Sequence, residues 1–305
     1  MTLGESPGAC VLPGSFFQNG TCFREVKLHP PTGRVEELLE GASNSHCLAS
    51  SITTLLAHCI ERIGPITTIT PEIVRNLLVG DRDYLVLKLR QITIGDRVEA
   101  ILVCPNPKCG EKIDIDFNLR HVPIKQGRIS SQVFTVRLPR REAFGEDERD
   151  KHCRVEFCLP NGGDQEELAP LAITNESEAV NKLLARCIQR IDGITEIDES
   201  LVDKLSPSAR SEIEKTMAEL VPQIDLEMEA KCPECEVVFS FPFNISQFFL
   251  DELKVNLNQL YEEVHFLAFY YKWSESEILS MTRKKRRTYL GLLSEQIERS
   301  NRGHA

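Results

Sequence analysis

The sequence predicts an α+β protein in which two copies of one module meet through cysteine-tipped β-hairpins and are followed by a C-terminal helical segment. Three observations predict this class. The chain repeats itself at a fixed shift, short alternating strands accompany amphipathic helices, and a pair of cysteines recurs at the end of each copy. A length of 305 residues suits two domains with proper cores. The expected divisions are a flexible N-terminal tail at 1–21, a first module at 22–125, a second module at 126–248 and C-terminal helices at 249–305.

The internal repeat is the first of these observations. Segment 55–63 aligns with segment 183–191, a shift of 128 positions, and the same shift places Cys104 on Cys232. Two copies are too few for a solenoid, which needs three or more repeats. The repeat therefore favours a pseudo-twofold pair of modules.

Each copy is expected to begin with short strands in which apolar and polar residues alternate. The alternation covers 24–28 in the first copy and 133–138 and 154–159 in the second, where the charged loop 140–150 would join two strands as a hairpin. The stretch before the first strand is rich in Gly, Ser and Pro, and this composition predicts the flexible tail.

Amphipathic helices are expected to follow the strands. Apolar residues recur at helical spacing over 48–63 and again over 180–191. Thr70 and Ser206 each precede a proline, and a side-chain cap before a proline suits the first turn of a further helix.

Composition excludes several classes of function. A net charge of −10 gives no general affinity for nucleic acid or anionic membrane. No stretch reaches the roughly 18 apolar residues of a membrane span, and the N-terminus lacks the features of a signal peptide. A nucleophile elbow, a phosphate loop and an HExxH motif are all missing, so the sequence predicts neither an enzyme nor a small-molecule substrate.

Four of the eleven cysteines have the spacing of metal ligands. Cys104 and Cys109 enclose four residues, Cys232 and Cys235 enclose two, and alternating apolar and polar residues flank both pairs. A tight turn between two strands aims both sulfurs at one point and suits a soft tetrahedral cation. Each pair supplies half a coordination sphere, so the sequence predicts one structural Zn²⁺ shared by the two modules.

Three other interpretations of these cysteines stay open at this point. Two local disulfides would need an oxidising compartment. A redox-active pair needs a strand followed by a helix, whereas strands flank both pairs here. The hairpins could also be degenerate and bind no metal.

The C-terminal segment carries the candidate partner-binding residues. Its apolar positions from Leu250 to Leu267 form a helical stripe, and 274–277 is a capping box. An aromatic cluster then suits either the core or a docking surface, and a basic run opposes the dipole of the helix that it begins. The basic run could pair with acidic groups of the same chain, lie on a solvated face, or bind an acidic protein or nucleic acid. The candidates are Tyr270, Tyr271, Trp273, Arg283, Lys284, Lys285, Arg286 and Arg287.

Three stretches of the chain resemble a known family. The stretch 263–279 with the basic run and Tyr289-Leu290, the stretch 77–85 before the first cysteine pair, and the stretch 159–166 are together similar to T4-type phage baseplate hub assembly proteins. The longer spacing of the first cysteine pair departs from the family pattern and leaves the ligand set open.

The resemblance implies a function in the contractile tail of a phage or a related bacterial injection system. It implies a chaperone or structural component of the baseplate hub, with hub or tail proteins as partners and no enzymatic activity. The expected location is the bacterial cytoplasm, with incorporation into the tail baseplate as an open alternative. The second functional hypothesis is a zinc-ribbon adaptor that binds nucleic acid through the C-terminal basic run.

Overall fold

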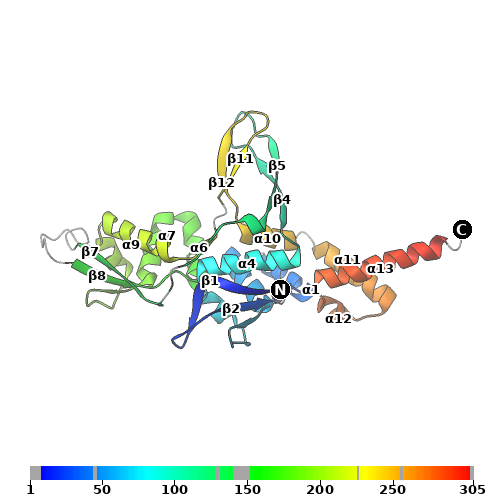
Figure 1. The fold of residues 1–305 in the computed structure, drawn as a ribbon, viewed down its shortest axis with the longest axis horizontal. Coiled ribbons are helices and arrows are strands. Elements are labelled where there is room, and N and C mark those ends of the chain that lie inside the picture. The colour runs from blue at the N-terminus through cyan, green and yellow to red at the C-terminus, as the bar shows by residue number, and fades with distance from the viewer. Residues whose placement is uncertain are drawn as a thin grey trace, which may run out of the picture.

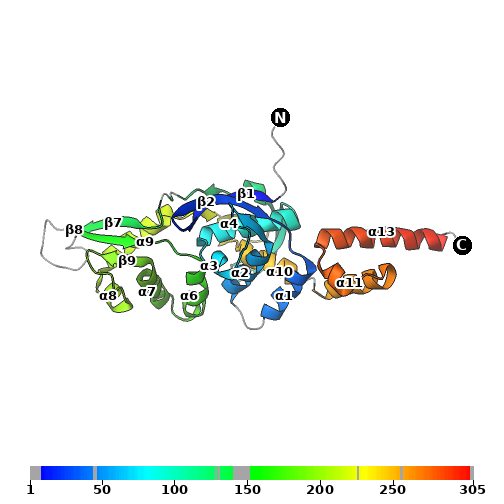
Figure 2. The same cartoon turned by 90° about the horizontal axis from the view of Figure 1, so that it is seen from below.

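The computed structural model describes residues 8–43, 47–127, 129, 131–139, 152–224, 227–254 and 257–302. It confirms a mixed α+β chain. Two lobes lie side by side along the long axis, a β-hairpin arm projects from the central lobe, and helices α11 and α13 form the opposite end (Figure 1). In the view of Figure 2 the long strands of both lobes lie along the upper side, and most of their helices lie below them.

The central lobe contains the first half of the chain. Its first three strands form a sheet of order β1-β2-β3, and its last two strands form the first hairpin of the arm. The elements are β1 (Ala9–Gln18), β2 (Thr21–Leu28), α1 (Gly33–Ser43), α2 (Leu48–Cys59), β3 (Ile60–Ile63), α3 (Pro71–Arg75), α4 (Val79–Thr93), β4 (Arg97–Val103) and β5 (Lys112–Asn118).

The outer lobe repeats this order of elements. Its sheet has the order β7-β8-β9, and its last two strands form the second hairpin of the arm. The elements are β7 (Phe134–Pro139), β8 (His152–Phe157), α6 (Gly162–Thr174), α7 (Glu176–Cys187), β9 (Ile188–Ile191), α8 (Glu199–Lys204), α9 (Pro207–Leu220), β11 (Glu227–Lys231) and β12 (Val238–Pro242). Helices α2 and α7, like strands β3 and β9, begin 128 positions apart, the shift found in the sequence.

A short ladder joins the two lobes. The 3₁₀ turn η1 (Leu119–His121) leads to β6 (Ile124–Lys125), which pairs antiparallel with β10 (Gln223–Ile224). The expected hairpin of the second half is also present, because β7 pairs with β8. Its connecting loop, expected at 140–150, lies outside the described residues.

Local signals account for several helix boundaries. The Thr70 hydroxyl accepts a hydrogen bond from the N–H of Ile73, and Ser206 does the same for Ala209, as the two capping signals predict. The expected helix over 48–63 is too long, because α2 ends at Cys59 and its last four residues form β3. Pairing of β3 with β2 satisfies backbone groups that a longer helix would have to bond internally.

The predicted N-terminal tail is wrong for residues 9–18. These residues form β1, and its side chains Leu12 and Phe16 are buried in the first core. A register shift between Val11 and Phe16 accommodates the intervening Pro and Gly, and the N–H of Gly14 donates to the buried carboxylate of Asp81 at 2.7 Å. The Pro-Gly-Ser composition thus marks a bulge within a core strand.

The predicted boundary at 248/249 also needs correction. Helix α10 (Ile245–Lys254) comes after the outer lobe in sequence, yet its Phe249, Leu250 and Leu253 complete the core of the central lobe. The outer lobe has a separate core drawn from residues 138–217. Helix α10 therefore returns the chain to the first half.

Helices α11 (Leu257–Tyr271), α12 (Glu275–Leu279) and α13 (Arg283–Arg302) form the C-terminal unit around a small core of their own. The predicted capping box is present, since Ser274 and Glu277 exchange hydrogen bonds at the start of α12. Among the described residues, no helix is both long enough and apolar enough to cross a membrane.

Candidate functional site

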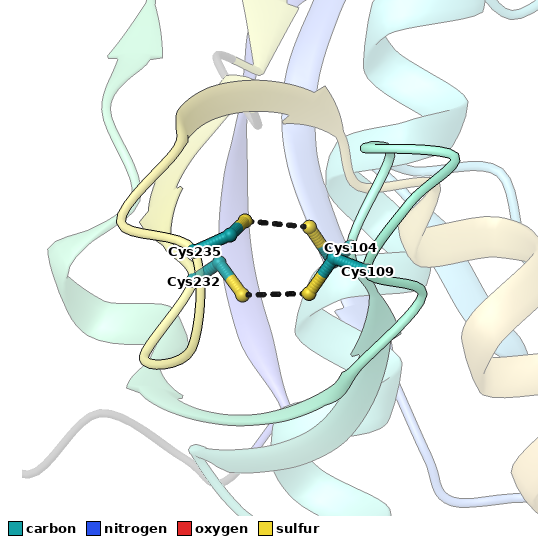
Figure 3. Close-up of side chains that lie close together, drawn as sticks. All are labelled: Cys104, Cys109, Cys232 and Cys235. Carbon is teal, nitrogen blue, oxygen red and sulfur yellow. Dashed lines mark hydrogen bonds between the residues drawn. The ribbon is translucent and has the colours of Figure 1, made fainter.

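The four cysteines with ligand spacing come together near the end of the arm. Cys104 and Cys109 follow β4, whereas Cys232 and Cys235 follow β11. All four sulfurs lie within 4.8 Å of one another, and two contacts between sulfurs cross from one hairpin to the other (Figure 3). The Cys104–Cys235 sulfurs are 3.6 Å apart and the Cys109–Cys232 sulfurs 3.7 Å apart. All four residues are free thiols, so the arrangement is a cluster that can bind a metal ion.

The register of the two hairpins explains why the sulfurs converge. Directly paired residues share one face of a hairpin, and Leu102 pairs with Ile113 while Ala230 pairs with Phe239. Of these side chains, Leu102, Ile113 and Phe239 pack against the cysteines in a small cluster. The residue after the second cysteine, Gly110 or Glu236, has a positive φ in both hairpins, which turns the chain back toward the returning strand.

Backbone N–H groups point at three of the sulfurs. The N–H of Val237, together with the side chains of Cys104, Asn106 and Cys232, lowers the pKa of Cys235 to about 7 although burial opposes the shift. The N–H of Glu111 acts in the same direction on Cys109, but burial and the adjacent thiols raise the pKa of that group to about 12. Four adjacent thiolates repel one another, so their joint ionisation requires a cation among them.

The geometry of the cluster fits a tetrahedral thiolate site. A Zn–S bond of about 2.3 Å in a tetrahedron gives a sulfur–sulfur edge of about 3.8 Å. The two sulfur pairs that meet across the hairpins, at 3.6 and 3.7 Å, lie near that value. Cys104 and Cys232 are buried and Cys109 and Cys235 partly buried, so bound metal would be shielded from water.

The basic run of α13 has internal acidic partners, which is one of the alternatives expected from the sequence. Arg286 is buried and contacts both Glu36 of α1, at 3.1 Å, and Glu263 of α11, at 2.7 Å. Arg283 is also buried and lies 3.2 Å from Glu36. These two arginines dock the C-terminal unit onto the central lobe, so the expected partner-binding role does not apply to them.

The other three cations stay on the surface. Lys284 and Lys285 are exposed, and the side chain of Arg287 is 55% exposed while its guanidinium lies 3.5 Å from Glu263. These three cations remain accessible to a partner.

The aromatic cluster divides between core and surface. Tyr271 stacks on Trp273 with ring centroids 4.6 Å apart, and both rings meet Tyr289 of α13. Tyr270 instead lies on the outer face of α11 and is 46% exposed.

The same aromatic cluster contains two phenylalanines that were not among the candidate partner-binding residues. Phe266 and Phe269 are 48% and 58% exposed on α11. They lie three residues apart, off the buried face that carries Leu260, Val264 and Leu267, and this spacing could have identified them.

Comparisons with known proteins identify the family. The model of the family described as "T4 bacteriophage base plate protein" matches residues 18–250. A search of curated proteins and a search of solved structures found no match. The matched region includes the outer lobe, most of the central lobe and all four clustered cysteines, but it ends before α11, so the stretch 263–279 lies outside it. Since the match covers well over half of the chain, the protein belongs to the T4 bacteriophage base plate protein family.

Proposed function

We propose that this chain is a non-enzymatic assembly chaperone or structural component of the baseplate hub in a contractile tail, and that one zinc ion stabilises its arm. Membership of the family supports a structural role in the baseplate and contacts with other baseplate or tail proteins. The cluster of four cysteines supports the metal.

We assign zinc a structural role because of the ligand set. Four thiolates fill a tetrahedral sphere and leave no position for a substrate or a reactive water molecule. A two-stranded hairpin is at best marginally stable by itself, so two hairpins in one arm gain stability when a shared ion crosslinks them. The repeated order of elements supports the further inference that both halves derive from one duplicated module.

Metal analysis of the purified protein tests this assignment. We expect about one equivalent of zinc per chain. The double variant Cys232→Ser/Cys235→Ser should lose the zinc and melt at a lower temperature. Cys22→Ser/Cys47→Ser is the matched control, because both of its thiols lie outside the cluster. Unchanged zinc content in the first variant would remove the shared site from consideration.

We propose that the outer face of α11 and the exposed cations of α13 contact the partner protein. Three exposed aromatic rings and three accessible cations lie in this unit, and aromatic side chains and arginine are enriched at protein interfaces. They are Phe266, Phe269, Tyr270, Lys284, Lys285 and Arg287. Nucleic acid is the weaker alternative, because two of the five cations in the run are engaged internally.

Coexpression with hub and tail-tube proteins encoded beside the gene tests this surface. We expect coelution that Phe266→Ser/Phe269→Ser disrupts, while Ile173→Ser, at an exposed apolar residue of the outer lobe, leaves it intact. Salt-sensitive binding of DNA or RNA that disappears in Lys284→Ala/Lys285→Ala would instead support the nucleic-acid adaptor.

A further inference from the structure

Among the described residues, three arginine side chains are at most 2% exposed, and one of them has no bonded carboxylate there. Arg90 donates two hydrogen bonds to Glu252, at 2.9 and 3.0 Å. Arg286 is held between two glutamates. Arg82 of α4 makes a single hydrogen bond, from Nη2 to the carbonyl of Ala49 at 2.6 Å, and its Nε and Nη1 have no partner among the described residues.

The carboxylates nearest to Arg82 are engaged elsewhere. Glu166 accepts hydrogen bonds from Thr53 and from Arg75, the latter at 2.8 Å. Asp83 accepts one from Ser246 at 3.1 Å. A buried guanidinium without a bonded anion is costly, and in the other two cases the fold supplies glutamate. Arg82 is therefore prepared for an anion that the described part of the chain does not provide.

The guanidinium of Arg82 packs directly against Gly162 and borders a cavity. A Cβ on Gly162, the first residue of α6, would collide with Arg82, so only glycine fits there. Arg82 also lines a cavity of about 730 Å³ where α2, α4, α6 and the base of the arm meet. Each lobe contributes to the walls, so a ligand here would contact both halves of the chain.

The remaining walls of the cavity suit the end of a peptide. Three amide side chains, those of Gln165, Gln223 and Asn244, line it and can both donate to and accept from a peptide backbone. Asp83 is the closest negative wall group, and burial raises its pKa, which weakens its repulsion of an incoming anion. Glu227 also lines the cavity, but it is an exposed residue.

A second cavity adjoins the first. It has a volume of about 660 Å³ and shares five wall residues with the first, namely Asp83, Gln165, Ala169, Gln223 and Ile224. Its other walls are mostly apolar, with Leu168, Val180 and Leu183 among them. Volumes of this size are usual for ligand sites. The two cavities together offer a cation beside an apolar chamber.

We propose that the carboxyl-terminal end of a partner protein enters these cavities, with its terminal carboxylate on Arg82 and its apolar side chains in the adjoining chamber. A chain end is the part of a protein that carries both a free carboxylate and a backbone to bond with amide side chains. The site goes beyond the proposed function, because it requires neither the metal nor the exposed face of α11.

Calorimetric titration with short peptides tests this site. The probe is an acetylated tetrapeptide of alanine and leucine with a free carboxyl terminus, and the same peptide with a terminal amide is its control. We expect the acid to bind roughly tenfold or more tightly than the amide, because hydrogen bonds to a charged group distinguish the two. Octanoate and its methyl ester test a free organic acid as the alternative source of the carboxylate.

Two variants connect binding to the site. Arg82→Met should abolish binding of the acid without lowering Tm, because it removes no bond to a carboxylate, whereas Arg90→Met should lower Tm by removing two hydrogen bonds to Glu252. Ala169→Phe places a large side chain where the two cavities meet, keeps Arg82 and should also abolish binding. It therefore tests the proposal if Arg82→Met does not fold. Equal binding of acid and amide, binding that survives both variants, or binding of octanoate without the peptide would each overturn the proposal.

Discussion

Replacing Arg286 by methionine should release the C-terminal unit from the central lobe. The Arg286 guanidinium bonds to Glu263 at 2.7 Å, to Glu36 at 3.1 Å and to the carbonyl of Met281 at 2.8 Å, and the side chain is 1% exposed. Methionine can fill much of the same space but leaves two buried carboxylates without their shared partner.

The magnitude follows from what remains after the change. Removing one member of a buried ion pair costs about 3–5 kcal/mol. Here Glu36 keeps Arg283 at 3.2 Å and Glu263 keeps Arg287 at 3.5 Å, so the lower end applies, about 3 kcal/mol. A loss of that size makes the undocked state roughly a hundredfold more populated.

Urea unfolding followed by tryptophan fluorescence measures this effect. Trp273 is the only tryptophan of the chain and lies in the small core of the C-terminal unit, so its emission reports on that unit. We expect its transition to move to lower urea, while far-UV circular dichroism shows the two lobes unfolding later. Arg299→Met is the control, because its pair with Glu295 is exposed and contributes below about 0.5 kcal/mol. A fluorescence midpoint equal to that of the unmodified protein would refute the docking role of Arg286.

Substitutions at Asp81, Gly291 and Gly80 should each change the stability of the protein in a defined direction. Burial raises the pKa of Asp81 to about 7 although the N–H groups of Gly14 and Ser15 oppose the shift. The unfolded chain has a pKa of about 3.9, so the folded state loses stability as pH rises from about 4 to 7. Asp81→Asn should remove this loss, and an unchanged pH dependence of the urea midpoint would contradict the assignment. Gly291→Ala, within exposed α13 and free of contacts, should stabilise that helix by about 0.5–1 kcal/mol. Gly80→Ala should instead lower the thermal midpoint of the protein, because its Cβ would meet the carbonyl of Pro222, and equal midpoints for the two variants would speak against this contact.

The cysteine cluster was predictable because its signals are local and repeated. A pair of cysteines between two strands of alternating apolar and polar residues predicts a hairpin tip. The shift of 128 positions predicts that the two tips are equivalent. The sequence could not show the contacts between the hairpins, in which Cys104 faces Cys235 and Cys109 faces Cys232.

Long-range packing accounts for the predictions that failed. Pro and Gly normally interrupt strands, and the pattern of β1 gave no sign that Asp81, 67 residues later, bonds the bulge from the far side. Charged residues usually lie at the surface, so the run at 283–287 did not indicate that two of its members are buried against Glu36. The apolar stripe that begins at Leu250 predicted helix correctly, but periodicity does not say which core a helix completes.

The return of α10 to the central lobe has a consequence for biosynthesis. Most of the core of that lobe comes from residues 12–119, which leave the ribosome first, yet the core lacks one wall until residues 245–253 emerge. The core of the outer lobe comes from the single stretch 138–217 and can close while translation continues. The half that is made first is therefore finished last, and a nascent chain halted after β12 exposes apolar surface that a full-length chain covers.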